Sequence, residues 1–594
     1  MVGIVGFTKF SLTAPLNSPI EAMAKSITTG VHQQARLYLD NFMEAACVSL
    51  RGCSHCFDFR SEDGSVYAIV YGSIFGNTVN PAERLVQTYE YGKEALSKLN
   101  GSFCGVILMR NVPQVILITD RFGSRPLYYA FRDGDIIFSS HARGILSYPF
   151  PRKLNERTLV KFLLYGKVGI LGDDTWFEGI KLLPPASILT FPSNGKYTIE
   201  RYWDLEYFSE LSKKDAIESI CKAFKRAVNK MVNNTTGNVA VMLSGGLDSR
   251  SIVAALSTKN RRRITAVTFG VKGCDDISIA QKVTQRLGVS HIIIEYEPDE
   301  LSKYAEKVVY LTEGQDTVNV SYLPYVAEQM NRRGLSWYLQ GFMFDLLLGG
   351  SFLSKEFFES NDFIEVLEKK CRLFEFQEIK ELLNKRLLHL IPSVRKEFIE
   401  LAKESKGDSP ANKVDYFFIH TRVRRYTLMG SVILREFCEE ILPTIDNEVI
   451  EVIRKIPPEL RFNYRLYREF LLRLDSSLAK IPYQKTLIPP IFPHWLWRLG
   501  YLPLILNRII KGRLVKHTYF DFNEILRTSS HWKKLIRETL LNNKSLAYEL
   551  GYINKEFVEK LVRAHYSGKD FGEKLAFLIT FELLLRVFFP VNSY

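Results

Sequence analysis

A short apolar run that leads directly into a glycine-rich hexapeptide constrains the fold most strongly. Residues 238–243 read NVAVML, residues 244–249 read SGGLDS, and an apolar-periodic stretch follows from residue 250. This order predicts a strand, a tight turn and a helix. Glycines let backbone N–H groups approach a ligand closely, and a helix N-terminus favours anionic oxygen. The segment therefore predicts a strand–loop–helix unit that binds an anionic ligand.

The aspartate of the hexapeptide, Asp248, indicates a divalent cation. A carboxylate among phosphates repels them unless a cation lies between, so Mg²⁺ is expected. The Walker pattern G-x-x-x-x-G-K-[ST] is absent from the sequence. The alternative is a simple strand-to-helix turn capped by Ser249, which accounts for the two glycines better than for the whole hexapeptide.

The residue pattern of the chain changes from β-type to helical near residue 205. Before it, short β-type runs are separated by turn signals, and RDGD (132–135) and SNGK (193–196) are typical of hairpin turns. After about residue 212, helical periodicity dominates, as in 215–232. We expect two domains, residues 1–205 and residues 206–594, with about 170 mostly helical residues at the end.

Strand-like runs recur between the helices of the second domain. They lie at 238–243, 264–269, 291–296 and 336–341. Strands that alternate with helices predict a parallel sheet covered on both faces, and hence an α/β fold.

The net charge of +14 comes from 79 basic and 65 acidic residues. Much of the excess lies in 454–474 and 507–517. Solvated helix faces are the simplest explanation of this excess positive charge. The second explanation is a positive electrostatic field that attracts a nucleotide or pyrophosphate, and no nucleic-acid partner is expected.

Eight cysteines in 594 residues do not form a disulfide scaffold. Cys53 and Cys56 form a lone C-x-x-C with Cys47 nearby, and no second pair stands at zinc-ligand spacing. We expect buried thiols.

Two apolar segments near the C-terminus resemble membrane spans only superficially. Glu582 and Arg586 interrupt 575–591, and Pro503 breaks 495–510. A buried terminal helix is expected in the first case and no membrane span in either. Because the N-terminus also lacks a signal-peptide pattern, we expect a cytoplasmic protein.

Six motifs follow one another along the chain: RFGSRPLYYA (121–130), WFEGIKLLPPASIL (176–189), SGGLDS (244–249), QGFMFDLLLGG (340–350), LPTIDNEVIEVIRKIPPEL (442–460) and IPYQKT (481–486). This is the order expected for asparagine synthetases, and the chain resembles that family over nearly its full length. The resemblance implies an N-terminal Ntn-hydrolase-like α+β sandwich of the glutaminase type. It also implies a doubly wound parallel-sheet ATP-pyrophosphatase domain with a helical extension.

The chain departs from the family at the glutamine site. Family members that use glutamine carry a nucleophilic cysteine where this chain has Val2, and an N-G-E segment where it has Tyr71, Gly72 and Ser73. The first domain is therefore expected not to hydrolyse glutamine and to serve as a structural or docking unit.

The resemblance also implies the site residues. ATP would be bound by Leu243, Ser244, Gly245, Gly246, Asp248, Ser249, Phe269, Gln340 and Gly341. Mg²⁺ would be bound by Asp248 and Asp345, and Lys485 would be the catalytic cation on the developing pyrophosphate. The alternatives are a turn-capping role for Asp345 and a surface position for Lys485. Arg468 and Glu439 lie in family-like surroundings but could equally be structural.

The reaction expected from the resemblance is adenylation of a carboxylate, followed by attack of an amine that expels AMP. Phe342 stands where the family has a glutamate that serves the ammonia step, which favours an amine other than free ammonia. β-Lactam synthetases and lasso-peptide macrocyclases share the two-domain plan with an inactive first domain, so an intramolecular amide former is the alternative. The partners are thus a small-molecule or peptide carboxylate and an amine. A silent scaffold, an RNA-modifying enzyme and a homodimer remain open.

Overall fold

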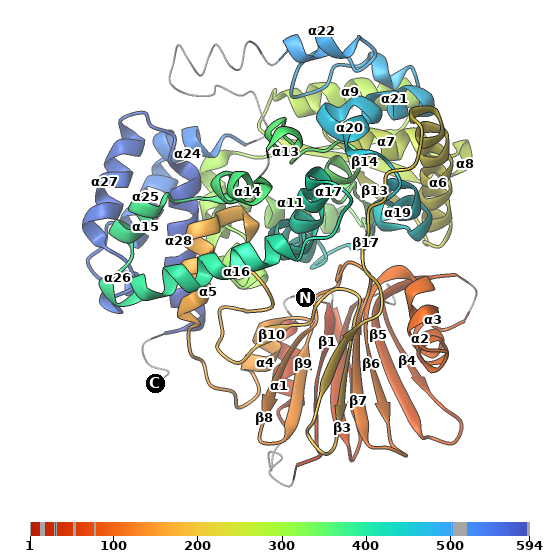
Figure 1. Ribbon diagram of the computed structural model, residues 1–594, viewed down its shortest axis with the longest axis vertical. Helices are drawn as coiled ribbons and strands as arrows, with labels where there is room; N and C mark the ends of the chain where they lie inside the picture. The colour runs from red at the N-terminus through yellow and green to blue at the C-terminus, as the bar shows by residue number, and fades with distance from the viewer. Residues whose placement is uncertain are drawn as a thin grey trace.

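The computed structural model in Figure 1 describes most of the chain. It covers residues 2–11, 18–28, 30, 33–51, 55–76, 79–360, 362–500, 502 and 520–590. Cys53, the basic run 507–517 and most of 501–510 lie outside the described residues.

The first third of the chain forms two antiparallel sheets that pack face to face, referred to below as the β-sandwich (Figure 1). One sheet has the order β10 (Lys181–Leu182), β8 (Tyr128–Arg132), β9 (Asp135–Ser139), β1 (Gly3–Thr8), β3 (Met43–Leu50) and β2 (Gln33–Leu39). The other has the order β12 (Thr198–Arg201), β11 (Ser187–Pro192), β7 (Gln114–Thr119), β6 (Asn100–Met109), β5 (Val66–Phe75) and β4 (Cys56–Arg60).

Both expected hairpin turns are confirmed. RDGD joins β8 to β9, with Asp133 and Gly134 both at positive φ, and SNGK joins β11 to β12, with Gly195 at positive φ. Two consecutive positive φ values give a turn whose twist matches that of the flanking strands, which explains the D-G pair.

The rest of the chain is organised around a five-stranded parallel sheet. Its order is β15 (Ser290–Glu295), β14 (Ile264–Gly270), β13 (Val239–Met242), β16 (Trp337–Leu339) and β17 (Glu439–Ile441). The four strands expected from the sequence are confirmed, and β17 is an additional edge strand. The chain runs outward from β13 in one direction and then returns to add β16 on the other side. This reversal places a topological switch point between β13 and β16, where α/β proteins bind ligands.

Two groups of helices cover the sheet. The helices α6 (Lys213–Asn233), α7 (Asp248–Ala255), α19 (Asn447–Ile453) and α21 (Arg465–Leu474) pack together, and α10 (Ala305–Thr312), α11 (Tyr322–Arg332) and α18 (Leu428–Leu434) form a second group. Right-handed crossovers put the connections before and after the switch point on opposite faces. The fold is therefore the doubly wound α/β fold expected for this part.

The terminal apolar segment forms α28 (Gly572–Phe588), a buried helix, as expected. Its carboxylate Glu582 is fully buried and accepts hydrogen bonds from Ser545 Oγ at 2.6 Å and from the Ala547 N–H at 3.0 Å. Arg586 Nε donates to the same carboxylate at 2.7 Å. Within the described residues, no helix is both long and apolar enough to cross a bilayer.

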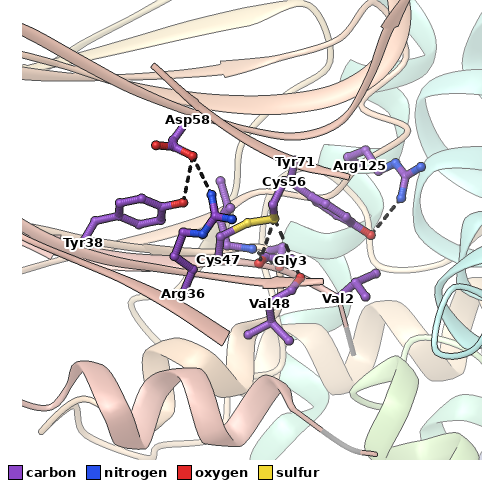
Figure 2. Close-up of a disulfide and its surroundings, with 12 residues drawn as sticks. Val2, Gly3, Arg36, Tyr38, Cys47, Val48, Cys56, Asp58, Tyr71 and Arg125 are labelled. Carbon is purple, nitrogen blue, oxygen red and sulfur yellow. Dashed lines mark hydrogen bonds and ion pairs between the residues drawn. A yellow bond between two sulfur atoms is a disulfide. The ribbon is translucent and has the colours of Figure 1, made fainter. Parts of the chain in front are cut away.

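The expectation of free thiols is wrong for one pair of cysteines. Cys47 on β3 and Cys56 on β4 form a disulfide that joins the two sheets (Figure 2). Their Cα atoms are 6.2 Å apart, a distance set by sheet packing that the spacing of cysteines along the chain does not reveal. The described free cysteines are all buried, as expected: Cys104, Cys221, Cys274, Cys371 and Cys438.

Candidate functional site

The hexapeptide forms the loop between β13 and α7, at the switch point of the sheet. The loop is held by its own hydroxyls, since the Ser244 N–H donates to Ser249 Oγ at 3.1 Å and the Gly246 N–H donates to Ser244 Oγ at 3.2 Å. The Gly245 N–H donates to the buried carboxylate of Asp276 at 2.9 Å. The glycine-rich loop therefore has a fixed shape before any ligand binds.

A cavity of about 400 Å³ lies at the carboxyl ends of β13, β14 and β16. Among the expected site residues, the structure brings Leu243, Ser244, Asp248, Ser249, Phe269, Gln340, Gly341 and Asp345 into its lining. Gly245 and Gly246 lie in the same loop but outside the lining. The lining also contains Met242, Thr268, Asp276, Leu323, Phe342, Met343, Thr427, Gly430, Ser431 and Leu434. Segments as far apart in sequence as 242–249 and 427–434 thus meet in one cavity.

The Asp248 carboxyl lies in a crowded acidic environment. Burial raises its pKa to about 8, and the neighbouring charge of Asp345 adds to this effect. The Tyr467 hydroxyl donates a hydrogen bond to Asp248 Oδ1. This bond and the charge of Lys485 both lower the pKa of Asp248, but they do not restore its ordinary value. A carboxyl group whose ionisation is opposed by burial and by a neighbouring carboxylate is a suitable ligand for a hard cation, with that neighbour as the second ligand.

Lys485 lies beside the loop rather than in the cavity wall. Its Nζ is 3.3 Å from the Tyr464 hydroxyl and 5.6 Å from the centre of the Tyr464 ring. The preceding residue docks onto the hexapeptide, since the Gln484 N–H donates to the Gly245 carbonyl at 3.2 Å. This backbone contact places residue 485 beside the glycine-rich loop, and the Tyr464 hydroxyl contacts the ammonium.

Arg250 is a site residue that the sequence reasoning missed. Its guanidinium, fully buried in α7, donates to the carbonyls of Leu478, Ile481 and Pro482 at 3.2, 2.8 and 2.8 Å. These bonds fix the segment that carries Lys485 against the loop. An arginine in an apolar helical run gives no local sign of such a partner.

One wall of the cavity comes from an unusual helix. Thr427 ends a π-helical segment, η5 (Ile419–Thr427), and α18 follows at once with Gly430, Ser431 and Leu434. Ser431 Oγ accepts a hydrogen bond from Gln340 Nε2 at 2.7 Å. π-Helical turns are rare and occur frequently at functional sites.

Arg468 and Glu439 lie outside the cavity lining. Arg468 donates to the carbonyl of Pro490 at 2.8 Å and also to that of Phe492. Glu439 forms a fully buried ion pair with Arg125 of the β-sandwich. Both contacts fit the structural alternative.

The position of the expected glutamine site is almost filled. Val2, Tyr71, Pro126, Ser140, His141, Val432 and Arg435 enclose a cavity of only about 10 Å³. Arg125 Nη1 donates to the Tyr71 hydroxyl at 2.8 Å, as Figure 2 shows. Such a volume holds one water molecule at most and is far too small for glutamine.

Comparison with known proteins agrees with this architecture. A family model described as asparagine synthase matches residues 219–586, and one described as glutamine amidotransferase domain matches residues 76–203. The chain is 23% identical over 463 residues to asparagine synthetase [glutamine-hydrolyzing] 1 of Bacillus subtilis, covering 71% of this chain and 72% of that protein.

Two further relatives match smaller shares. A putative asparagine synthetase of Methanocaldococcus jannaschii is 28% identical over 311 residues, which cover 49% of this chain and 54% of that protein. The amidase chyE of Penicillium rubens is 24% identical over 291 residues, or 43% of this chain and 42% of that protein. Because the first family model covers more than half of the chain, the protein belongs to the asparagine synthase family.

Proposed function

We propose that the protein is an ATP-dependent ligase that activates a carboxylate as an acyl-adenylate and joins it to an amine. The observation that carries this proposal is the meeting of Asp248, Asp345 and the hexapeptide loop at one cavity. Residues 248 and 345 follow the ends of different strands, and two neighbouring carboxyl groups removed from water are costly unless a cation pairs with them. Family membership supports the reaction class.

The residues present fit a magnesium ion. Asp248 and Asp345 supply oxygen ligands, and Mg²⁺ is commonly held by one or two carboxylates together with substrate phosphates. Bound there, the ion would neutralise charge on the phosphate oxygens. Asp248 then serves as a ligand only when ionised, although burial raises its pKa to about 8 in the free protein.

In the first step, a carboxylate oxygen of the substrate attacks the α-phosphorus of ATP, and the bond to the bridging oxygen of pyrophosphate breaks. The N–H groups of Ser244, Gly245 and Gly246 are engaged by Ser249, Asp276 and Ser244. The hydroxyl groups of Ser244 and Ser249 at the N-terminus of α7 are therefore the donors that the loop offers to the departing pyrophosphate. Lys485 lies beside the same loop and adds a positive charge that is worth most as charge develops.

In the second step, an amine attacks the acyl carbon and AMP leaves, giving an amide. Holding both reactants in one cavity supplies much of the rate. The ring of Phe342 lines this cavity and, unlike a carboxylate, can neither form an ion pair with ammonium nor accept a proton. This favours an amine that belongs to a larger molecule, and an intramolecular amide former is the second candidate.

The charges that line the cavity indicate which class of substrate acid it can bind. Its described lining contains the carboxyl groups of Asp248, Asp276 and Asp345 and no lysine or arginine. A substrate with a second free carboxylate, such as aspartate, would meet no matching cation there. We therefore propose a monocarboxylate with an apolar body as a better substrate than aspartate.

Exchange of labelled pyrophosphate into ATP tests the proposal. The protein is incubated with Mg·ATP and a panel of acids that contains aspartate, apolar monocarboxylates and peptide acids, with the Asp345→Asn variant as the matched control. Exchange that depends on one acid and is lost in the variant is the expected result. No exchange with any acid, together with no ATP binding by calorimetry, would instead identify a scaffold.

A further inference from the structure

A buried polar network connects the β-sandwich with the cavity. It begins at Tyr71, whose hydroxyl accepts a hydrogen bond from Arg125 Nη1 at 2.8 Å and whose ring lies 4.7 Å from the Arg125 guanidinium carbon. Arg125 Nη2 forms an ion pair with Glu439, the first residue of β17. Arg125 and Glu439 are both fully buried.

The neighbouring residue of β17 continues the network to the cavity. The Glu440 carboxylate pairs with Arg435 and accepts hydrogen bonds from the Tyr338 hydroxyl at 2.8 Å and from Gln340 Nε2. Arg435 Nη1 in turn donates to the Ser124 carbonyl of the β-sandwich at 2.8 Å. Residues 124 and 125 therefore engage both acidic residues of one strand.

The strand that carries these two glutamates, β17, depends on these ion pairs for its stability. β17 has three residues and lies at the edge of the sheet, where β16 is its one partner among the described strands. So short an edge strand has little stability of its own, and two buried carboxylates are costly unless they are paired. Burial opposes ionisation of Glu439, yet Arg125, with His55 and Arg435, holds its pKa below the ordinary value. The ion pair thus fixes β17 against the β-sandwich.

The position of Gln340 depends on the same strand. Gln340 follows β16 directly, and its Nε2 donates to Ser431 Oγ and to the Glu440 carboxylate. With both amide hydrogens engaged, its carbonyl oxygen is the atom left to accept a hydrogen bond from a ligand. An exocyclic amine such as that of adenine is a matching donor.

We propose that the β-sandwich acts as a positioning unit for the nucleotide, with Arg125 as the positioning residue that sets the Gln340 amide through β17. This inference rests on the proposed binding of ATP at the cavity. It gives the sandwich a role that requires no chemistry at Val2. The measured quantity is the dissociation constant of ATP in the presence of Mg²⁺, determined by calorimetry on the full chain.

The test variant combines Arg125→Met with Glu439→Gln, so that no buried charge is left unpaired. It is expected to bind ATP about tenfold more weakly than the wild type. The matched control combines Arg143→Met with Glu313→Gln, which removes another buried ion pair, at 3.6 Å, between the sandwich and the rest of the chain. Within the described part of the chain, the hydrogen bonds of this pair involve no network residue, so ATP affinity is expected to stay within about twofold.

A second comparison distinguishes an effect that acts through Gln340 from a non-specific loss of rigidity around the cavity. In a Gln340→Ala background, the Arg125 and Glu439 changes are expected to weaken ATP binding by less than about twofold further, because the residue they position is gone. If the first variant fails to fold, Tyr71→Phe replaces it, with an expected loss of about threefold.

The outcomes distinguish the two proposals. Wild-type affinity in the network variants overturns the positioning role and leaves the proposed function intact. An equal loss in the control pair, or an undiminished loss in the Gln340→Ala background, also overturns it. A wild-type protein that binds no ATP removes the proposed function itself.

Discussion

Gly341 lies directly against Asp248: a Cβ carbon added to Gly341 would be 2.4 Å from the Asp248 Cβ atom. Real Cβ atoms essentially never approach so closely, so the position has no room for a side chain. The contact joins the residue that follows β16 by two positions to the first residue of α7. These two elements flank the switch point, and the glycine sets how closely they approach.

Substitution Gly341→Ala is expected to push Asp248 away from the cavity. Overpacking of this kind costs about 1–3 kcal/mol of folding free energy. Pyrophosphate exchange should fall about tenfold or more, because small displacements of reacting groups are expensive. The control is Gly30→Ala, since a Cβ there meets nothing within 4 Å. Equal exchange rates in the two variants would contradict the prediction.

Neutralising Asp345 should raise the stability of the metal-free protein and lower its activity. The Asp345→Asn variant removes a charge that raises the pKa of Asp248. In the absence of Mg²⁺, its thermal unfolding midpoint is expected to lie above that of the wild type, while pyrophosphate exchange falls about 100-fold. Differential scanning calorimetry and the exchange assay measure the two effects. A lower midpoint without metal would show that the acidic pair is not strained.

Restoring a cysteine at position 2 should not restore glutamine hydrolysis. The cavity next to Val2 measures about 10 Å³, and Tyr71 and Arg435 occupy its walls. The Val2→Cys variant is therefore expected to release no glutamate from glutamine, because the substrate cannot reach the new thiol. An assay for glutamate over hours, with buffer as the blank, decides the matter. Release above the blank would mean that the walls open.

Removal of the disulfide should destabilise the β-sandwich. Cys47 and Cys56 are separated by 9 positions, and closing so short a loop contributes about 2–3 kcal/mol in the chain-entropy account. The Cys47→Ser, Cys56→Ser double variant should unfold at a lower urea concentration than the wild type. Its ATP affinity should change by less than about twofold: Cys56 lies opposite the network residue Tyr71 in the β4–β5 pair, but this pairing is made by the backbone and does not need the S–S bond. The reduced wild-type protein is the natural comparison.

Asp316 should make the free energy of unfolding depend on pH. Burial raises the pKa of this carboxyl to about 7, despite hydrogen bonds from the Thr317 N–H and from Tyr426. Between about pH 4 and pH 7, the folded protein keeps a proton that the unfolded chain releases, so stability falls as pH rises.

The Asp316→Asn variant should lose this slope of up to about 1 kcal/mol per pH unit. Urea unfolding at several pH values measures it. The exposed Asp133→Asn variant should retain the slope of the wild type. A slope that persists without Asp316 would assign it to another group.

The sequence predicted the central sheet and the loop because their signals are local. The run NVAVML and the S-G-G-L-D-S loop are contiguous, and the structure has β13 and the start of α7 there. β17 could not be predicted in the same way, since its three residues include Glu439 and Glu440, which are unusual in a buried strand. Glu439 becomes acceptable through Arg125, which lies more than 300 positions earlier, and Glu440 through Arg435.

The candidate site also contains some residues that a local motif predicts and others that depend on long-range contacts. Asp248 and Asp345 were indicated by motif, and their meeting at one cavity follows from the order of parallel strands. Arg250, Tyr467 and Asp276 support the site through contacts with residues distant in sequence. The disulfide belongs to this class too, because only the packing of two sheets brings its cysteines together.

The π-helical segment η5 has a consequence for how the length of this chain can vary. Each residue of a helix turns the chain by about 100°, so losing one residue from Ile419–Thr427 would rotate all of α18 by that angle. Ser431 would then face away from Gln340, and the cavity would lose a wall. A single-codon deletion at 419–427 is thus far more damaging than most substitutions there, although every amino acid of α18 would be unchanged.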